Sequence, residues 1–190
     1  MSEQDLPPYS LDVETLDLGP GVKAIGMELV ETENREPLRG PEAIAVWSAV
    51  FPALVAQEPY AVDFFSHLDR VRDFCASRKI PFREAAGRCI VVPQPSEAQL
   101  LELLERFEGE TFGLRTGSKT LQPDAELEGD LSKRGLDAYQ SAYTRYTFCV
   151  VCELEDGWLT ILSETLWPSE TVRRVRPALQ PFDVHIARPN

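Results

Sequence analysis

Cys149 and Cys152, in the segment CVVC, have the spacing of thiol redox sites and of zinc sites. A redox cysteine of the thioredoxin type needs a helix N-terminus to lower its pKa, but this pair lies in a β-rich run. Strand alternation there puts the two side chains on opposite faces. A zinc site needs a second ligand pair, which Cys75 and Cys89 do not provide. We interpret the cysteines as buried, reduced thiols and predict no metal and no cofactor.

Other chemical groups form no catalytic set either. Asp63 and His67 are four residues apart on a predicted helix, but a third metal ligand is missing. His185 lies in the last predicted strand beside no acid or nucleophile that forms an obvious pair, so we interpret it as a structural histidine, and no serine-centred G-x-S-x-G turn occurs. A pair of acidic residues around the C-terminal hairpin has the chemistry for acid–base catalysis, although an exposed hairpin rim is the ordinary explanation for them. They are Glu153, Glu155, Asp156 and Glu164. We predict no catalytic residue.

Arginine and aromatic side chains are the candidate binding residues. Arg173, Arg174 and Arg176 form a basic patch suited to a phosphate or to a partner's carboxylates, or a solvent face that balances an acidic protein. Trp158 follows a turn and Trp167 precedes a helix cap; each is either a binding hot spot or a hinge-packing residue. Three tyrosines complete the set, as candidates to line a cleft together with Trp158. They are Tyr139, Tyr143 and Tyr146.

The composition limits the classes of partner. The chain of 190 residues is 43% hydrophobic, enough for a full-sized core, and it holds no apolar run long enough to cross a membrane. The first residues are acidic, without Lys or Arg before Lys23, which is the opposite of a signal peptide. The net charge of −12 disfavours nucleic acid and favours cationic partners. We therefore expect a cytoplasmic protein that binds neither nucleic acid nor membrane.

The elements that must position these residues follow from periodicity and turn signals. We predict strands, helices and connections from the hydrophobic period, with Ser96 and Gln99 as a capping box, Asp156-Gly157 as a hairpin turn and Pro177 as a helix end. The predicted elements are an extended or disordered arm at 1–20, a strand at 21–31, helices at 42–57 and 59–78, a strand pair around 86–87, a helix at 95–109, a strand at 110–117, an acidic linker at 118–135, a short helix at 136–143, strands at 146–154 and 158–166, a helix at 168–176 and a strand at 182–189.

This order predicts an α+β fold of two ferredoxin-like halves, 21–117 and 136–190, packed together. Each half contains a strand pair, a Pro-Ser-Glu segment, a helix and a strand, and the two Pro-Ser-Glu segments lie at 95–97 and 168–170. We interpret this as an internal repeat. One mixed α+β sheet with additions is the alternative.

The acidic surplus, the missing catalytic set and the aromatic residues at element boundaries suggest a function. The first hypothesis is a non-catalytic cytoplasmic regulator, adaptor or immunity-like inhibitor that binds a protein with a basic surface. A small-molecule sensor with a cleft between the two halves is the second hypothesis. An enzyme without a recognisable motif is the third.

Overall fold

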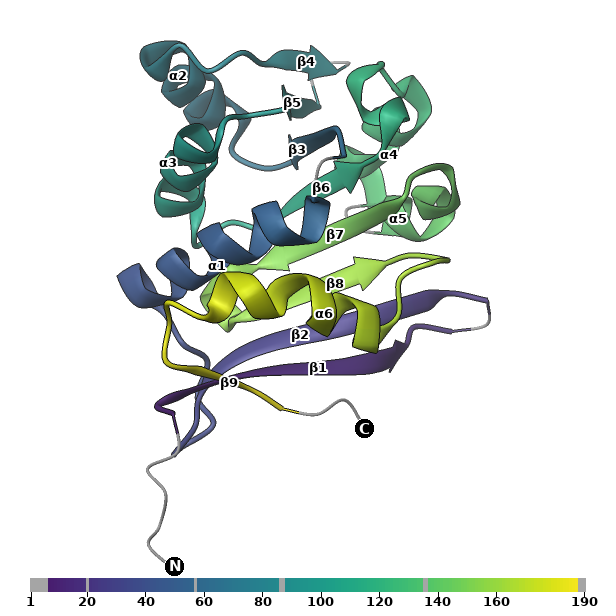
Figure 1. The fold of residues 1–190 in the computed structure, drawn as a ribbon. Coiled ribbons are helices and arrows are strands. Elements are labelled where there is room, and N and C mark those ends of the chain that lie inside the picture. The colour runs from purple at the N-terminus through teal and green to yellow at the C-terminus, as the bar shows by residue number, and fades with distance from the viewer. Residues whose placement is uncertain (1–6, 20, 57, 86–87, 135–136, 188–190) are drawn as a thin grey trace, which may run out of the picture.

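The computed structural model describes residues 7–19, 21–56, 58–85, 88–134 and 137–187. In these residues the chain forms one mixed α+β unit, in which a single mostly antiparallel sheet has helices on both faces (Figure 1). None of the described helices combines the length and the apolar character needed to cross a bilayer.

The sheet has nine strands in the spatial order β4-β5-β3-β6-β7-β8-β2-β1-β9. Neighbouring strands pair antiparallel, except that β9 runs parallel to β1. The strands are β1 (Tyr9–Asp17), β2 (Lys23–Glu31), β3 (Tyr60–Phe64), β4 (Arg83–Ala85), β5 (Cys89–Pro93), β6 (Phe112–Thr116), β7 (Phe148–Glu153), β8 (Trp158–Leu162) and β9 (Val184–Ile186).

The helices divide unequally between the two faces. Four of them, α1 (Gly40–Val55), α2 (Leu68–Arg78), α3 (Glu97–Phe107) and α6 (Pro168–Leu179), bury their apolar sides against one face. The shorter α4 (Ala125–Arg134) and α5 (Asp137–Ala142) lie on the other face. The sheet therefore separates two hydrophobic clusters.

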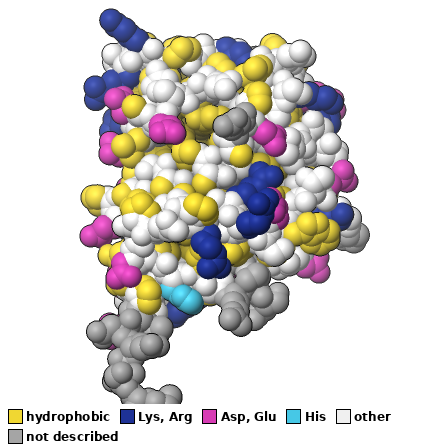
Figure 2. Space-filling view, viewed as in Figure 1, with side chains coloured by type: hydrophobic (Ala, Val, Ile, Leu, Met, Phe, Trp, Pro, Cys, Tyr) yellow, Lys and Arg dark blue, Asp and Glu magenta, His cyan; other side chains and the backbone are white. Residues whose placement is uncertain are grey.

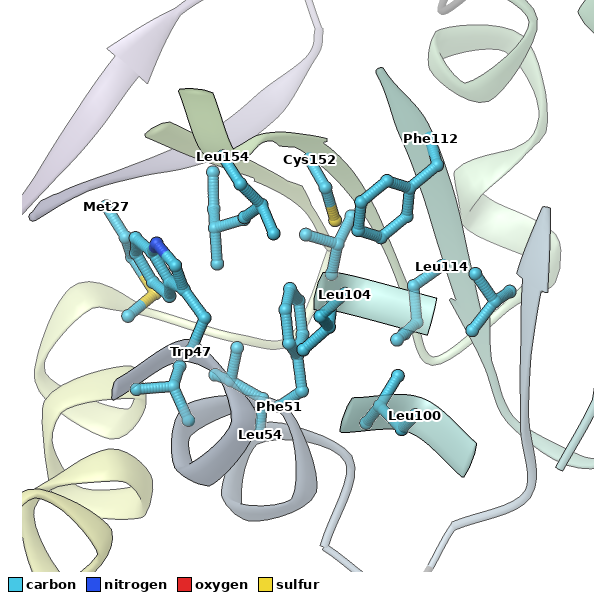
Figure 3. Close-up of a cluster of buried hydrophobic side chains, with 14 of the residues drawn as sticks. Met27, Trp47, Phe51, Leu54, Leu100, Leu104, Phe112, Leu114, Cys152 and Leu154 are labelled. Atoms are coloured by element: carbon cyan, nitrogen blue, oxygen red, sulfur yellow. The ribbon is translucent and has the colours of Figure 1, made fainter. Parts of the chain in front are cut away.

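The larger core lies between the sheet and the four helices. Apolar residues of α1 recur at helical spacing, at Ile44, Trp47, Phe51 and Leu54, and all four are buried. Burying one such side chain contributes about 1.5–3 kcal/mol. Figure 3 shows side chains of α1 and α3 packed against those of the strands, among them Met27, Phe112, Leu114 and Cys152.

Local sequence signals are confirmed where they are strong. Ser96 caps α3: the Gln99 backbone N–H donates to Ser96 Oγ at 3.3 Å, and the Ser96 N–H donates to Gln99 Oε1 at 2.9 Å. The hairpin between β7 and β8 also forms, with Gly157 left-handed at φ 67° after a short 3-10 turn (Leu154–Asp156). An L side chain at Gly157 would be strained.

Several predicted elements were wrong. The predicted arm at 1–20 contains β1, which is an interior strand because β2 and β9 pair with its two edges. The segment 59–78 is not one helix: β3 occupies its start because β5 and β6 pair on both sides of it, and left-handed His67 separates β3 from α2. The predicted linker at 118–135 contains α4, whose Leu127 and Leu131 are buried.

Three further predictions differ from the structure. Helix α6 continues past Pro177 to Leu179; Pro177 is exposed, so water can satisfy the carbonyl that its missing N–H leaves unpaired. The Pro-Ser-Glu segments begin their helices differently, since the N-cap of α6 is Trp167, without a side-chain cap bond. The two predicted halves are not confirmed, because β2 pairs with β8 across the predicted boundary. One mixed α+β sheet, the alternative, fits.

Candidate functional site

One half of the sheet has helices on one side only. Helix α4 contacts β4 and β5, and the 3-10 turn after α5 (Tyr143–Arg145) contacts β7. On the side of the sheet where α4 and α5 lie, Figure 1 shows no helix over β8, β2 and β1 within the described part of the chain. We call this side of β8, β2 and β1, together with the adjoining end of β7, the open face.

Strand alternation selects which side chains reach the open face. In β2, Ile25, Met27 and Leu29 point to the larger core, so Gly26 and Glu28 lie on the opposite side. The register aligns four residues side by side across β7, β8, β2 and β1: Glu153, Trp158, Glu28 and Asp12. We call the three carboxylates of this set, Asp12, Glu28 and Glu153, the acidic row. Val151, Thr160, Gly26 and Glu14 form the neighbouring row.

Trp158 is held against the sheet by its neighbours. A Cβ atom on Gly26 would lie 2.7 Å from Trp158 Cζ2, so the indole occupies the space directly over the Gly26 backbone. The indole Nε1–H donates to Thr160 Oγ1 at 2.9 Å. Leu16 approaches the same point of Gly26. The ring therefore has a fixed position, and it remains partly exposed.

The open face carries an excess of negative charge. Asp12 pairs with Arg35 and accepts a hydrogen bond from Ser10 Oγ at 2.7 Å. Burial alone would raise the pKa of Asp12, but these hydrogen bonds and the Arg35 charge outweigh it and lower the pKa. Within the described residues, Glu14, Glu28 and Glu153 have no ion-pair partner within 4 Å, although the charge of Glu28 acts on Arg35. The charge of His185, which pairs with Ser10 across β1 and β9, also acts on Asp12. Arg35 and His185 thus balance only part of the charge.

A second polar cluster is buried under α4 and α5. Asp63 of β3 accepts two hydrogen bonds from Arg115 of β6, at 2.6 and 2.8 Å, and both side chains are fully buried. Arg115 also pairs with Glu128 of α4 at 3.2 Å, and Glu128 pairs with Arg83. The cluster joins α4 to the sheet.

Tyrosines extend this cluster. The Tyr139 hydroxyl donates to Asp63 Oδ2 at 2.6 Å. Tyr146 donates to Asp124 at 2.6 Å and accepts from Arg115 Nη1 at 3.1 Å. Burial is the main reason that the pKa of Tyr146 is raised, and the hydrogen bond to Asp124 adds to it. Because its charges are paired and shielded, we interpret this cluster as structural.

The candidate binding residues do not form one site. Tyr143 and Tyr146 are buried, and the Tyr143 hydroxyl donates to the Gly21 carbonyl at 3.2 Å. Trp158 lies on the open face. Trp167 lies at one end of the sheet, 59% exposed, with Lys23 Nζ 5.6 Å from its ring centroid.

The arginines of α6 lie on the opposite face of the sheet from Trp158. Figure 2 shows Lys and Arg side chains gathered over α6. Arg173 and Arg174 both pair with Glu170, and Arg174 Nη1 also donates to the Leu54 carbonyl at 3.0 Å. Arg176 is exposed. Because Glu170 offsets charge on two of the three arginines, this patch is a weak anion site.

Glu170 gives a direct test of this pairing. Hydrogen bonds from Arg173 and then Arg174 lower its pKa from 4.5 to about 2. A carboxyl carbon titration by NMR should therefore show Glu170 with a midpoint near 2, and Arg173→Gln with Arg174→Gln should return it toward 4.5. Because the folded pKa is lowered, the pairing stabilises the fold above pH 4.5 and loses its effect as the pH falls toward 2. A midpoint near 4.5 in the unmodified protein would contradict the pairing.

The cysteines and histidines occupy separate places. Cys149 and Cys152 point to opposite faces of β7, as predicted, and both are buried. Burial raises the pKa of both thiols. His67 is exposed, with Nε2 3.3 Å from Glu110 Oε2. Asp63 is buried and pairs with Arg115, so the two residues do not act together. Among the described residues, no three His, Cys, Asp or Glu side chains are grouped to hold a metal ion.

Sequence reasoning missed most of the open face. It named Trp158 and Glu153, but not Glu28 or Asp12, because only the strand register brings these four together. The available signal was the run of polar residues at alternate positions of β1, namely Ser10, Asp12 and Glu14. Comparison with protein-family models, curated proteins and solved structures found no match.

Proposed function

We propose that this chain is a cytoplasmic, non-catalytic protein that binds a partner with a basic surface through its open face. The observation that carries the proposal is a row of carboxylates around a partly exposed tryptophan, on a sheet face that no described helix covers. Exposed aromatic residues are common in the energetic centres of protein interfaces. Carboxylates without an ion-pair partner among the described residues, such as Glu28 and Glu153, favour lysine and arginine side chains on the surface of the partner.

The charge of the whole protein supports the same class of partner. A net charge of −12 attracts a basic protein at long range and raises the association rate at low ionic strength. Regulators, adaptors and immunity-like inhibitors work by such binding. The sensor hypothesis is less well supported, because the three tyrosines proposed to line a cleft are buried and their hydroxyls bind protein groups.

We also infer two ferredoxin-like units with bounds other than those predicted. The chain order β3, α2, β4, β5, α3, β6, with β3 between β5 and β6, supports one unit. The order β2, α1, β7, β8, α6, β9 supports a second, which the first interrupts and into which β1 is added between β2 and β9. On this reading the open face belongs almost entirely to the second unit.

The test compares two variants with equal net charge. In the first variant, Glu28→Lys and Glu153→Lys reverse two charges of the acidic row. In the control, Asp73→Lys and Glu105→Lys reverse two exposed charges on α2 and α3, on the other face of the sheet. The unmodified protein and both variants are used as bait in a lysate of the source organism.

We expect a stoichiometric basic protein to bind the unmodified bait and the control, and to leave at high salt. Its affinity for the acidic-row variant should be at least about tenfold lower. Equal loss in both variants would show attraction to net charge without a site. Loss of partner binding in the control alone would place the site on the face of the sheet that α2 and α3 cover. Either result would overturn the proposal.

A further inference from the structure

Trp158 lies between two carboxylates, and this arrangement suits one kind of side chain. We propose that the open face recognises an arginine of the partner, with its guanidinium stacked on Trp158 and hydrogen-bonded to Glu28 and Glu153. This inference rests on the proposed function and specifies which group of the basic partner is bound.

The register places the two carboxylates on either side of residue 158 in the sheet. Trp158 is the direct cross-strand partner of Glu28 in β2 and of Glu153 in β7. Side chains at directly opposite positions of an antiparallel pair have Cβ atoms about 4.5–5.5 Å apart. A cation over the indole is therefore within reach of an oxygen on each side.

The ring itself is prepared to receive a cation. Its inner side lies against the Gly26 backbone, which has no side chain to lift it from the sheet. Its Nε1–H is already bonded to Thr160 Oγ1, so the group left to a ligand is the π face. Arg35, whose charge interacts with that of Glu28, is bound to Asp12, and it is not in a cation–π contact with Trp158 among the described residues. At the end of the same sheet, Lys23 lies over Trp167 in a related contact.

Arginine fits this arrangement better than lysine does. A guanidinium is planar, stacks on aromatic faces and carries donors along its edge, so it can contact the ring and two carboxylates at once. An ammonium group is a compact and strongly hydrated charge that gains less from stacking. The open face should therefore distinguish the two residues even though both are cationic.

The experiment uses three peptides of equal length as probes: triarginine, trilysine and tricitrulline, the last being an uncharged analogue of arginine. The three tryptophans give three indole N–H signals in a proton–nitrogen NMR spectrum. The signal missing from the Trp158→Leu spectrum identifies Trp158. Trp167→Leu is the matched control, because it removes the exposed tryptophan that lies outside the open face.

We expect triarginine to shift the Trp158 signal in a saturable manner, and trilysine to bind about two- to fivefold more weakly. Tricitrulline should cause no saturable shift. The Trp158 variants lack this signal, so their affinity is measured by isothermal titration calorimetry. Trp158→Leu should weaken triarginine binding about two- to fivefold, whereas Trp158→Tyr should retain part of the affinity and Trp167→Leu all of it. Gly26→Ala places a Cβ atom where the ring lies, so it should move the Trp158 signal and weaken triarginine binding.

Failure of this inference differs from failure of the proposed function. If triarginine and trilysine bind equally, and Trp158→Leu and Gly26→Ala bind as the unmodified protein does, arginine recognition at Trp158 is overturned. The proposed function still stands in that case if Glu28→Lys with Glu153→Lys abolishes partner binding. If the two charge reversals leave partner binding unchanged, the proposed function fails as well.

Discussion

Replacing Arg115 by alanine should lower the free energy of unfolding by about 3–5 kcal/mol. The guanidinium is fully buried and pairs with Asp63 and Glu128, which are also buried. Its removal leaves Asp63 in the interior without its cation, whereas Glu128 keeps its pair with Arg83. The cost of a buried unpaired charge exceeds that of a lost surface contact. Urea denaturation followed by circular dichroism gives the change.

Arg72→Ala is the matched control for this prediction. Arg72 also pairs with two carboxylates, Asp69 and Glu84, but in an exposed setting where water and salt screen the charges. Its replacement should have a far smaller effect than that of Arg115. Equal losses in the two variants would contradict a structural role for the buried cluster.

Gly113→Ala should cost about 3 kcal/mol of folding free energy, because a methyl group cannot fit between β6 and α5. A Cβ atom on Gly113 would lie 2.1 Å from the Tyr139 hydroxyl oxygen and 2.4 Å from Cε2. The tyrosine would have to move, and its hydrogen bond to Asp63 would be lost inside the protein. Thermal unfolding by calorimetry measures the loss.

Gly129→Ala in α4 provides the control. Within the described residues, no heavy atom outside the α4 backbone lies within 4 Å of a Cβ atom at Gly129, so this variant should gain up to about 1 kcal/mol from the better helix propensity of alanine. If Gly113→Ala were as stable as the unmodified protein, Tyr139 of α5 would not be packed against Gly113 of β6.

The buried cluster around Arg115 and the contact of Gly113 with Tyr139 determine which part of the sheet α4 and α5 cover, and therefore which part stays open. The buried ionic cluster and the contact at Gly113 hold α4 and α5 over β4, β5, β3 and β6. The two helices are too short to reach the far strands, and no other described helix lies on that side. The open face is thus a consequence of where the short helices are fixed.

Local features of this fold could be predicted from the sequence because their signals are local. The capping box of α3 needs only Ser96 and Gln99, and the β7–β8 hairpin needs only Gly157 and the flanking apolar runs. Strand β1 was missed because its acidic residues suggested an exposed arm. Its strand structure depends on pairing with β2 and β9, and β9 follows more than 160 residues later in the chain.

The two polar clusters could not be predicted for a related reason. Asp63 and Arg115 are separated by 52 residues, and they meet only because β3 and β6 are neighbours in the sheet. The acidic row needs the register of four strands from both ends of the chain. A sequence shows which side chains alternate, but not which strands lie side by side.

The measurement that tests the central claim most directly is zero-length carbodiimide cross-linking of the complex with the captured partner, followed by mass spectrometry. This reagent joins a carboxylate to a lysine amine only where the two are in contact. We expect cross-links from the open face to lysines of the partner, mainly from Glu14 because Glu28 and Glu153 are the proposed contacts of an arginine. We expect none from Asp73 or Glu105, on the face of the sheet that α2 and α3 cover. Cross-links confined to Asp73, Glu105 and their neighbours would show that the partner binds the helices, and would contradict a binding function for the open face.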